Sequence, residues 1–261
     1  MFSRFRSTIA GASEADIRRD PTLGGRLRIR EEGRLTVSYA PVDHVAMDAR
    51  VVFVGITPGA QQATNALIAA RSSILAGRSD AETLAAAKVF ASFSGPMRSN
   101  LVAMLDHIGL AARIRLRTCA SLWDADSGLA HFTSALRYPV FVGGENYSGQ
   151  PSMTKTASLR AILHQYLVEE ARMLHEAVWI PLGRPAVEGL QETVRLGVLS
   201  AAQVLDGLPH PSGANKERIA YFVGQKARAA LSEKTNAVKL DLAREPLIAQ
   251  VAALSASGGV R

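Results

Sequence analysis

The chain has 261 residues, 48% of them hydrophobic, which suits one large domain with a sizeable core and excludes a chain that is disordered throughout. Its 30 Lys and Arg against 23 Asp and Glu give a net charge of +7, so a polyanionic partner such as a nucleic acid is favoured. The single cysteine, Cys119, excludes an internal disulfide and cysteine-rich metal sites, and the histidines lack metal-type spacing, so we expect no metal.

The first 48 residues are interpreted as an N-terminal extension. Their beginning contains no long apolar stretch, so neither a signal peptide nor a membrane span is predicted, and we expect a soluble, cytoplasmic protein. In residues 26–39, two runs of alternating apolar and polar residues flank Glu-Glu-Gly, and this pattern predicts a β-hairpin.

Residues 49–231 are predicted to form the main domain, in which strands alternate with helices. Short apolar, β-branched runs predict buried strands, and Ala-rich or helically periodic segments predict helices. The predicted strands are 50–55, 118–123, 131–138, 177–183 and 203–209, and the predicted helices are 60–78, 80–91, 98–110, 157–176, 184–197 and 215–231. This order indicates the α/β class, a three-layer α/β/α sandwich with a mainly parallel central sheet. Residues 232–261 are interpreted as a basic C-terminal tail.

The first candidate loop, 55-GITPG-59, comes between a predicted buried strand and a predicted helix. In parallel sheets, ligands bind beyond the carboxyl ends of the strands, where backbone N–H groups and helix N-termini are available. Gly55 and Gly59 let the backbone approach a ligand closely. Pro58 biases Thr57 towards an extended backbone and thereby directs its side chain.

The second candidate loop, 210-HPSG-213, also follows a predicted strand and precedes a predicted helix. His210 offers an imidazole at the strand end, and Ser212 is suited to cap the helix or to contact a phosphate. Gly213 permits close approach of the backbone. The polar and cationic groups that follow are Asn215 and Lys216.

A strand that ends in GxxPG, followed roughly 150 residues later by HPSG, resembles the uracil-DNA glycosylase superfamily, in particular its mismatch-specific and single-strand-selective branches. Residues 93–110 and 177–183 resemble the segments that follow the first motif and precede the second. The resemblance covers about residues 50–226. It implies a DNA repair hydrolase for base excision, which cleaves the N-glycosidic bond of uracil or a related deaminated or damaged base. It implies no metal and no organic cofactor, with single- or double-stranded DNA as the partner.

The resemblance also implies roles for individual residues. Thr57 matches the position that orients the attacking water, and His210 matches the residue that stabilises negative charge on the departing base, so both are predicted to be catalytic. The expected base-binding residues are Gly55, Ile56, Phe93, on which the base would stack, and Ser134. The expected DNA-binding residues are Pro58, Gly59, Ser212, Gly213, Ala214, Asn215 and Lys216.

Three positions differ from the family's pattern: Thr57 stands where relatives have Asn or an acid, Ser134 where they have Asn, and Ala214 where they have a wedge residue. A damaged, single-stranded or non-uracil base requires less unstacking and would suit such a site. Two alternatives remain open. One is a non-catalytic nucleic-acid- or nucleotide-binding protein with the same fold, and the other is an enzyme that acts on free nucleotides or nucleosides.

Overall fold

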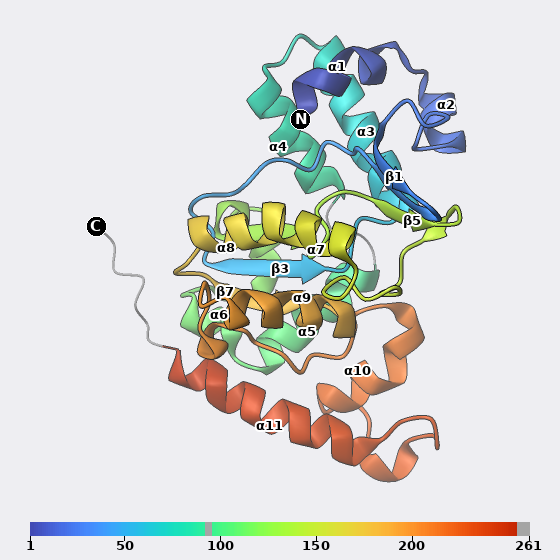
Figure 1. Ribbon diagram of the computed structural model, residues 1–261. Coiled ribbons are helices and arrows are strands. Elements are labelled where there is room, and N and C mark those ends of the chain that lie inside the picture. The colour runs from blue at the N-terminus through green and yellow to red at the C-terminus, as the bar shows by residue number, and fades with distance from the viewer. Residues whose placement is uncertain (92–95, 255–261) are drawn as a thin grey trace.

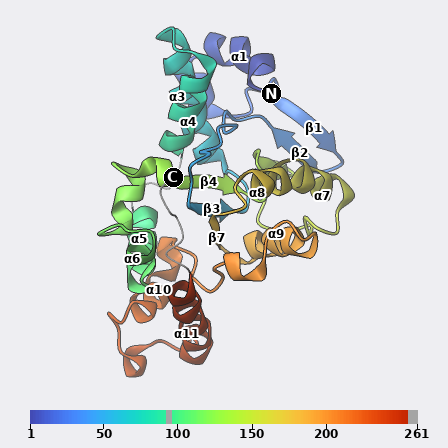
Figure 2. The same cartoon turned by 90° about the vertical axis from the view of Figure 1, so that its left-hand side faces the viewer.

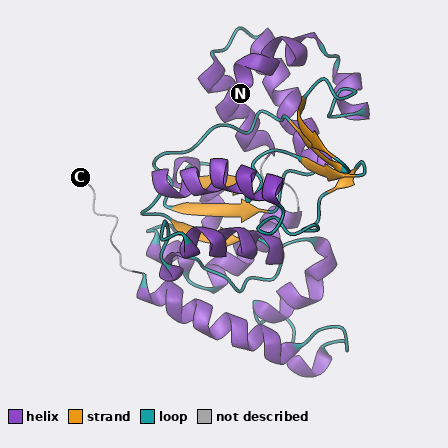
Figure 3. Ribbon diagram, viewed as in Figure 1, coloured by secondary structure: helices purple, strands orange, loops and turns teal. Residues whose placement is uncertain are grey.

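The computed structural model describes residues 1–91 and 96–254 and has a mixed α/β architecture with two sheets (Figures 1 and 3). The parallel sheet has the order β4-β3-β7 and the antiparallel sheet the order β1-β2-β5-β6. The strands are β1 (Arg28–Glu32), β2 (Leu35–Ser38), β3 (Val51–Gly55), β4 (Ala130–Ser134), β5 (Val140–Val142), β6 (Glu145–Asn146) and β7 (Val178–Pro181).

Helices pack on both faces of the parallel sheet (Figure 2). Side chains of β3 alternate between the faces, as expected for a strand: Val52 and Val54 join one hydrophobic core, and Val51 and Phe53 join the other. The first core includes residues of α3 (Ala60–Leu75), α4 (Asp80–Ala91), α7 (Ala157–Leu163), α8 (Glu169–Met173) and α9 (Arg184–Arg195). The second includes residues of α5 (Pro96–His107), α6 (Leu110–Arg113), α10 (Lys216–Phe222) and α11 (Ala237–Ala253).

The first 48 residues pack against the rest of the chain. The predicted hairpin is confirmed, since β1 and β2 pair in antiparallel fashion, and β2 also pairs with β5 from the middle of the chain. Two further helices, α1 (Phe2–Gly11) and α2 (Glu14–Arg19), precede the hairpin. Their buried residues, such as Ile9 and Ile17, belong to the same core as Val52 of β3.

The strand predicted at 118–123 was wrong, because this segment is a 3₁₀ helix, Cys119–Trp123. Its start is held by the carboxylate of Asp106, which accepts hydrogen bonds from the Cys119 amide at 2.7 Å and from the Thr118 hydroxyl at 2.6 Å. These bonds fix the first residues of the new helix, in which Cys119 and Leu122 are buried. A short apolar run is compatible with a strand or with a helix. Here the side chain of Asp106, which lies before this segment in the sequence, favours the helix.

The C-terminal part also differs from the prediction. The helix expected at 215–231 ends as α10 at Phe222, and the strand expected at 203–209 is reduced to a single parallel bridge between Trp179 and Val204. The predicted tail contains α11, whose Leu247 and Val251 are buried in the second core. Their spacing of four residues places both on the same face of the helix, which explains why α11 docks.

A glycine of α9 allows close packing against the chain that follows β4. A Cβ built on Gly189 would lie 2.8 Å from the Cβ of Ala135. We therefore expect Gly189→Ala to lower the free energy of unfolding by about 1–3 kcal/mol through overpacking. Urea unfolding followed by circular dichroism measures the change. Gly11→Ala is the control, since no atom lies within 4 Å of a Cβ there. An equal stability of the two variants would contradict the prediction.

Candidate functional site

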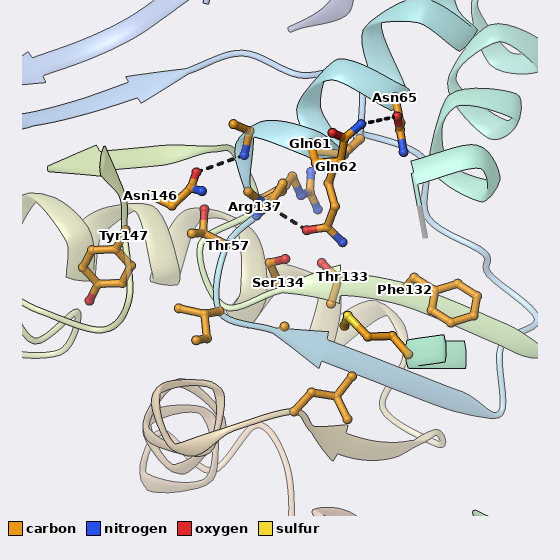
Figure 4. A pocket seen from close by; sticks show the side chains of 18 of the residues that line it. Thr57, Gln61, Gln62, Asn65, Phe132, Thr133, Ser134, Arg137, Asn146 and Tyr147 are labelled. Carbon is orange, nitrogen blue, oxygen red and sulfur yellow. Dashed lines mark hydrogen bonds between the residues drawn. The ribbon is translucent and has the colours of Figure 1, made fainter. Parts of the chain in front are cut away.

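A cavity of about 420 Å³ lies at the carboxyl ends of β3 and β4 and at the start of α3 (Figure 4). This volume lies within the range of small-molecule sites, about 300–1,000 Å³. The two candidate loops meet there, since the residues that line the cavity include Gly55, Ile56, Thr57, Pro58, Gly59, Ser134 and His210. The further lining residues are Val42, Ala60, Gln61, Gln62, Asn65, Lys88, Met97, Phe132, Thr133, Arg137, Asn146, Tyr147 and Leu182.

The other predicted site residues are placed differently. Ser212, Gly213, Ala214, Asn215 and Lys216 are not among the lining residues. They form a 3₁₀ turn and the start of α10, where Gly213, Ala214 and Lys216 are exposed. Phe93, the predicted stacking residue, lies outside the described residues.

Within the first loop, Thr57 bonds to the backbone. Its Oγ1 donates to the carbonyl oxygen of Tyr138 at 2.9 Å and accepts from the amide of Val140 at 3.2 Å. The hydroxyl proton is therefore already used, and one lone pair of the oxygen remains for a further donor. In this arrangement Thr57 joins the first loop to the start of β5.

The start of α3 is closed by side-chain amides. The Gly59 amide donates to Gln62 Oε1 at 3.2 Å, and the Ala60 amide donates to Asn146 Oδ1 at 3.0 Å (Figure 4). These bonds occupy two of the N–H groups that a helix start otherwise offers to an anion. Gln61 and Asn65 bond to each other at 3.0 Å. The part of the cavity at the start of α3 therefore presents mainly neutral amides.

In the second loop, His210 Nδ1 accepts a hydrogen bond from the Ser212 amide at 3.2 Å. Neutral imidazole then carries its proton on Nε2, which makes Nε2 a donor. Burial lowers the pKa of His210, so the neutral form predominates at pH 7. Asn100 Nδ2 donates to the carbonyl oxygen of Pro211 at 2.9 Å and ties the loop to α5.

A group of buried charges lies next to the cavity. Glu170 of α8 is 1% exposed and accepts a hydrogen bond from Arg137, whose guanidinium also lies 4.8 Å from the ring centre of Tyr166. His131 Nε2 is 3.6 Å from Glu170 Oε2. Burial alone would raise the pKa of Glu170, but His131, Arg137 and Lys88 outweigh it and hold the pKa well below its usual range. The carboxylate is therefore ionised at neutral pH.

Several lining residues were missed from the sequence. Lys88 was a charge within the Ala-rich stretch 82-ETLAAAKVF-90, which is a signal that could have been noticed. Phe132 is an aromatic residue two positions before Ser134, and its ring centre lies 5.2 Å from that of Phe53. Arg137, three positions after Ser134, also lines the cavity and forms an ion pair with Glu170.

Neither a metal site nor a membrane helix is present among the residues that the structure describes. Within 1–91 and 96–254, no group of three or more His, Cys, Asp or Glu side chains could hold a metal ion. No helix in those ranges is long and apolar enough to cross a membrane.

The bonds of Thr57 lead to a prediction about stability. Thr57→Val keeps the shape but leaves the buried Val140 amide without its acceptor, which we expect to cost about 1–3 kcal/mol. Thr57→Ser keeps the hydroxyl and should stay within about 1 kcal/mol of the wild type. Chemical denaturation of the three proteins tests this. A Val variant as stable as the wild type would show that the hydroxyl does not hold β5.

Comparison with known proteins finds a similar chain in a bacterium. The uncharacterized protein YoxB of Bacillus subtilis (strain 168) is 32% identical over 236 residues, which is 89% of this chain and 90% of that protein. No protein-family model matches the chain, and no solved structure matches it.

Proposed function

This chain belongs to the same protein family as Bacillus subtilis YoxB, whose name states no activity, and from the site we propose that it hydrolyses the N-glycosidic bond of a deaminated or damaged base in DNA. The proposal includes the three-layer fold of the uracil-DNA glycosylase superfamily, a place in DNA repair and a cytoplasmic location. Both faces of the parallel sheet carry helices, which is compatible with that fold.

The observation that carries the proposal is the convergence of the two loops. Thr57 and His210 are 153 positions apart in the sequence, and both line one cavity beyond the strand ends. Parallel α/β sheets bind ligands at such strand ends. The volume and the mixed lining suit a single nucleobase better than a longer segment of DNA.

In this mechanism, a base enters the cavity and the bond between its ring nitrogen and C1′ of the sugar breaks. The bonding electron pair leaves with the base, and Nε2–H of His210 donates to a base oxygen as its negative charge grows. Water then adds to C1′ and releases a proton to solvent. The free lone pair of Thr57 Oγ1 is available to accept a hydrogen bond from that water.

A second function, binding of a base or nucleotide without catalysis, is favoured by a different observation. The Thr57 proton is bonded to the Tyr138 carbonyl, and no Asp or Glu is among the described residues that line the cavity. No lining carboxylate is therefore placed to activate water. This alternative predicts affinity for the base or for DNA without an abasic product.

The test is an assay for abasic sites. Labelled single- and double-stranded oligonucleotides with uracil, hypoxanthine or xanthine are incubated with the protein and treated with alkali. Strand breaks that are lost with His210→Ala but kept with His175→Ala, a variant of an exposed histidine, are the expected result. If no substrate yields breaks while salt-sensitive DNA binding persists, the non-catalytic function is correct instead.

A further inference from the structure

Three side chains of the cavity form a donor-rich surface that we call the cationic wall: Lys88 of α4, Thr133 of β4 and Arg137, which follows β4. Lys88 and Thr133 are both less than 10% exposed. Arg137 bonds to Glu170, and the charges of Arg137 and Lys88 both lower the pKa of that carboxyl. Figure 4 shows Thr133 and Arg137 among the residues around the cavity.

Two atoms of the cationic wall lack a hydrogen-bond partner. They are the hydroxyl oxygen Oγ1 of Thr133 and Nε of Arg137, and both are buried. A buried polar atom without a partner is unfavourable, so a ligand that supplies the missing partner gains affinity. The Arg137 Nε–H can only donate, and it therefore requires an acceptor.

Lys88 adds a buried positive charge to this wall. Its Nζ donates to the carbonyl oxygen of Val42 at 2.7 Å. Burial lowers the pKa of Lys88 to about 8, so most of the population still carries the ammonium at pH 7. Attraction between this charge and an anion is stronger in a partly buried cavity than in water.

The carboxylates near the cationic wall do not line the cavity. No Asp or Glu appears among its described lining residues. Glu170 lies outside the lining and is bonded to Arg137, while the two oxygens of Asp43 accept from the hydroxyls of Tyr39 at 2.6 Å and Tyr138 at 2.5 Å. A ligand in the cavity therefore meets two cationic side chains and no carboxylate among the described lining residues, while Glu170 is the counter-charge of Arg137.

We propose that the cationic wall binds an anionic group of the ligand and that Lys88 makes the principal contact with it. This inference rests on the proposed function in one respect, that the ligand is a base or a nucleotide. Two sources provide such a group: an acidic base such as xanthine, which ionises near neutral pH, and the phosphate of a nucleotide. Lys88 thus makes the cavity select anionic ligands over neutral ones, such as neutral bases that carry an amino group.

The experiment measures binding of free ligands at pH 7.5 by isothermal titration calorimetry. The probes are xanthine, neutral hypoxanthine as its counterpart, and inorganic phosphate. Lys88→Met removes the charge and keeps the length of the side chain, and Lys239→Met removes an exposed lysine of α11 as the control for net charge. We expect an anionic probe to bind the wild type and the control equally, and to bind Lys88→Met roughly tenfold or more weakly.

The outcomes of the titrations identify the source of the anionic group and test the role of Lys88. Binding of xanthine identifies the base as the source of the anion, and binding of phosphate alone identifies a nucleotide. The proposal is overturned if no anionic probe binds the wild type, or if Lys88→Met binds it as tightly. Circular dichroism checks the fold, and Lys88→Gln replaces the Met variant should that one fail to fold.

These results separate the anion site from the glycosidase. Binding of xanthine through Lys88 without cleavage of any oligonucleotide would contradict the proposed enzyme and leave the anion site standing. Cleavage of hypoxanthine and xanthine at equal rates by both the wild type and Lys88→Met would leave the enzyme standing and remove the anion site.

Discussion

Replacing Glu170 with Ala is expected to lower the free energy of unfolding by about 3–5 kcal/mol, because it leaves buried cations without their counter-charge. Glu170 is 1% exposed and bonds to Arg137, whose side chain is 13% exposed. The change also removes the carboxylate that faces His131 at 3.6 Å. Denaturant unfolding followed by circular dichroism measures the effect, which should appear as a lower midpoint with an unchanged slope.

The adjacent residue provides the control for this variant. Glu169 pairs with Arg172 on the same helix, and both side chains are more than half exposed. An exposed ion pair contributes roughly 0–1 kcal/mol, so Glu169→Ala should scarcely alter the unfolding midpoint. If Glu170→Ala and Glu169→Ala lose the same small amount of stability, the buried pair does not hold the structure.

The pH dependence of this effect follows from the sign of the pKa shift. The pKa of Glu170 is lower in the folded than in the unfolded state, so its ionisation stabilises the folded state above the ordinary pKa of Glu. That contribution is lost as the pH falls below the unfolded value of about 4.3. We expect the stability difference between wild type and Glu170→Gln to be largest at pH 6–7 and smaller at pH 3, roughly as linkage requires. Thermal unfolding across this range tests it.

The other large expected effect concerns His210. If the proposed reaction occurs, His210→Ala should lower its single-turnover rate by about 10²–10³-fold, the usual cost of removing one donor to a developing negative charge. A rate within about threefold of the wild type would contradict the role, since that is less than 1 kcal/mol of transition-state stabilisation. The His175→Ala control should keep the wild-type rate.

The pH profile of the same reaction distinguishes a neutral His210 from a charged one. Burial lowers the pKa of His210, so the neutral form with its proton on Nε2 persists to slightly acidic pH. Below that lowered pKa, protonation of Nδ1 breaks its bond with the Ser212 amide and displaces the loop. We expect the rate to be flat near neutral pH and to fall on acidification. A rate that rises on acidification would show instead that the charged imidazole is required.

Much of the fold could be predicted from short segments. The buried run that became β3, the helix after Gly59 that became α3, and the strand that became β7 were all expected, since their signals lie within a few neighbouring residues. The strand expected at 118–123 was wrong, and no helix was predicted at 237–253, because both segments depend on partners distant in sequence. Residues 118–123 form a 3₁₀ helix because Asp106 holds their start, and residues 237–253 form α11 because a hydrophobic face there finds the second core.

Some residues of the candidate site could likewise be predicted from the sequence, and others could not. The position of Thr57 at the end of a strand followed from the order of strands and helices, whereas the strand expected before His210 is only a single bridge at Val204. The structure nevertheless places both residues on one cavity. The roles of Lys88 and Glu170 could not be read from the sequence. The role of a buried charge depends on the groups that contact it in the folded chain. These groups can be distant in sequence: Arg137 and Glu170, which bond to each other, are 33 positions apart.

By itself, the sequence determined the mixed α/β class, the turn after β3, the loop that carries His210 and the basic net charge of +7. Only the tertiary structure decided that the Thr57 proton bonds to Tyr138 and that Lys88 reaches the cavity. The physical reason is the range of the interactions. Backbone preferences and hydrophobic periodicity act between close neighbours in the chain, whereas burial, hydrogen-bond partners and the pKa of a buried charge depend on segments that meet only when the chain folds.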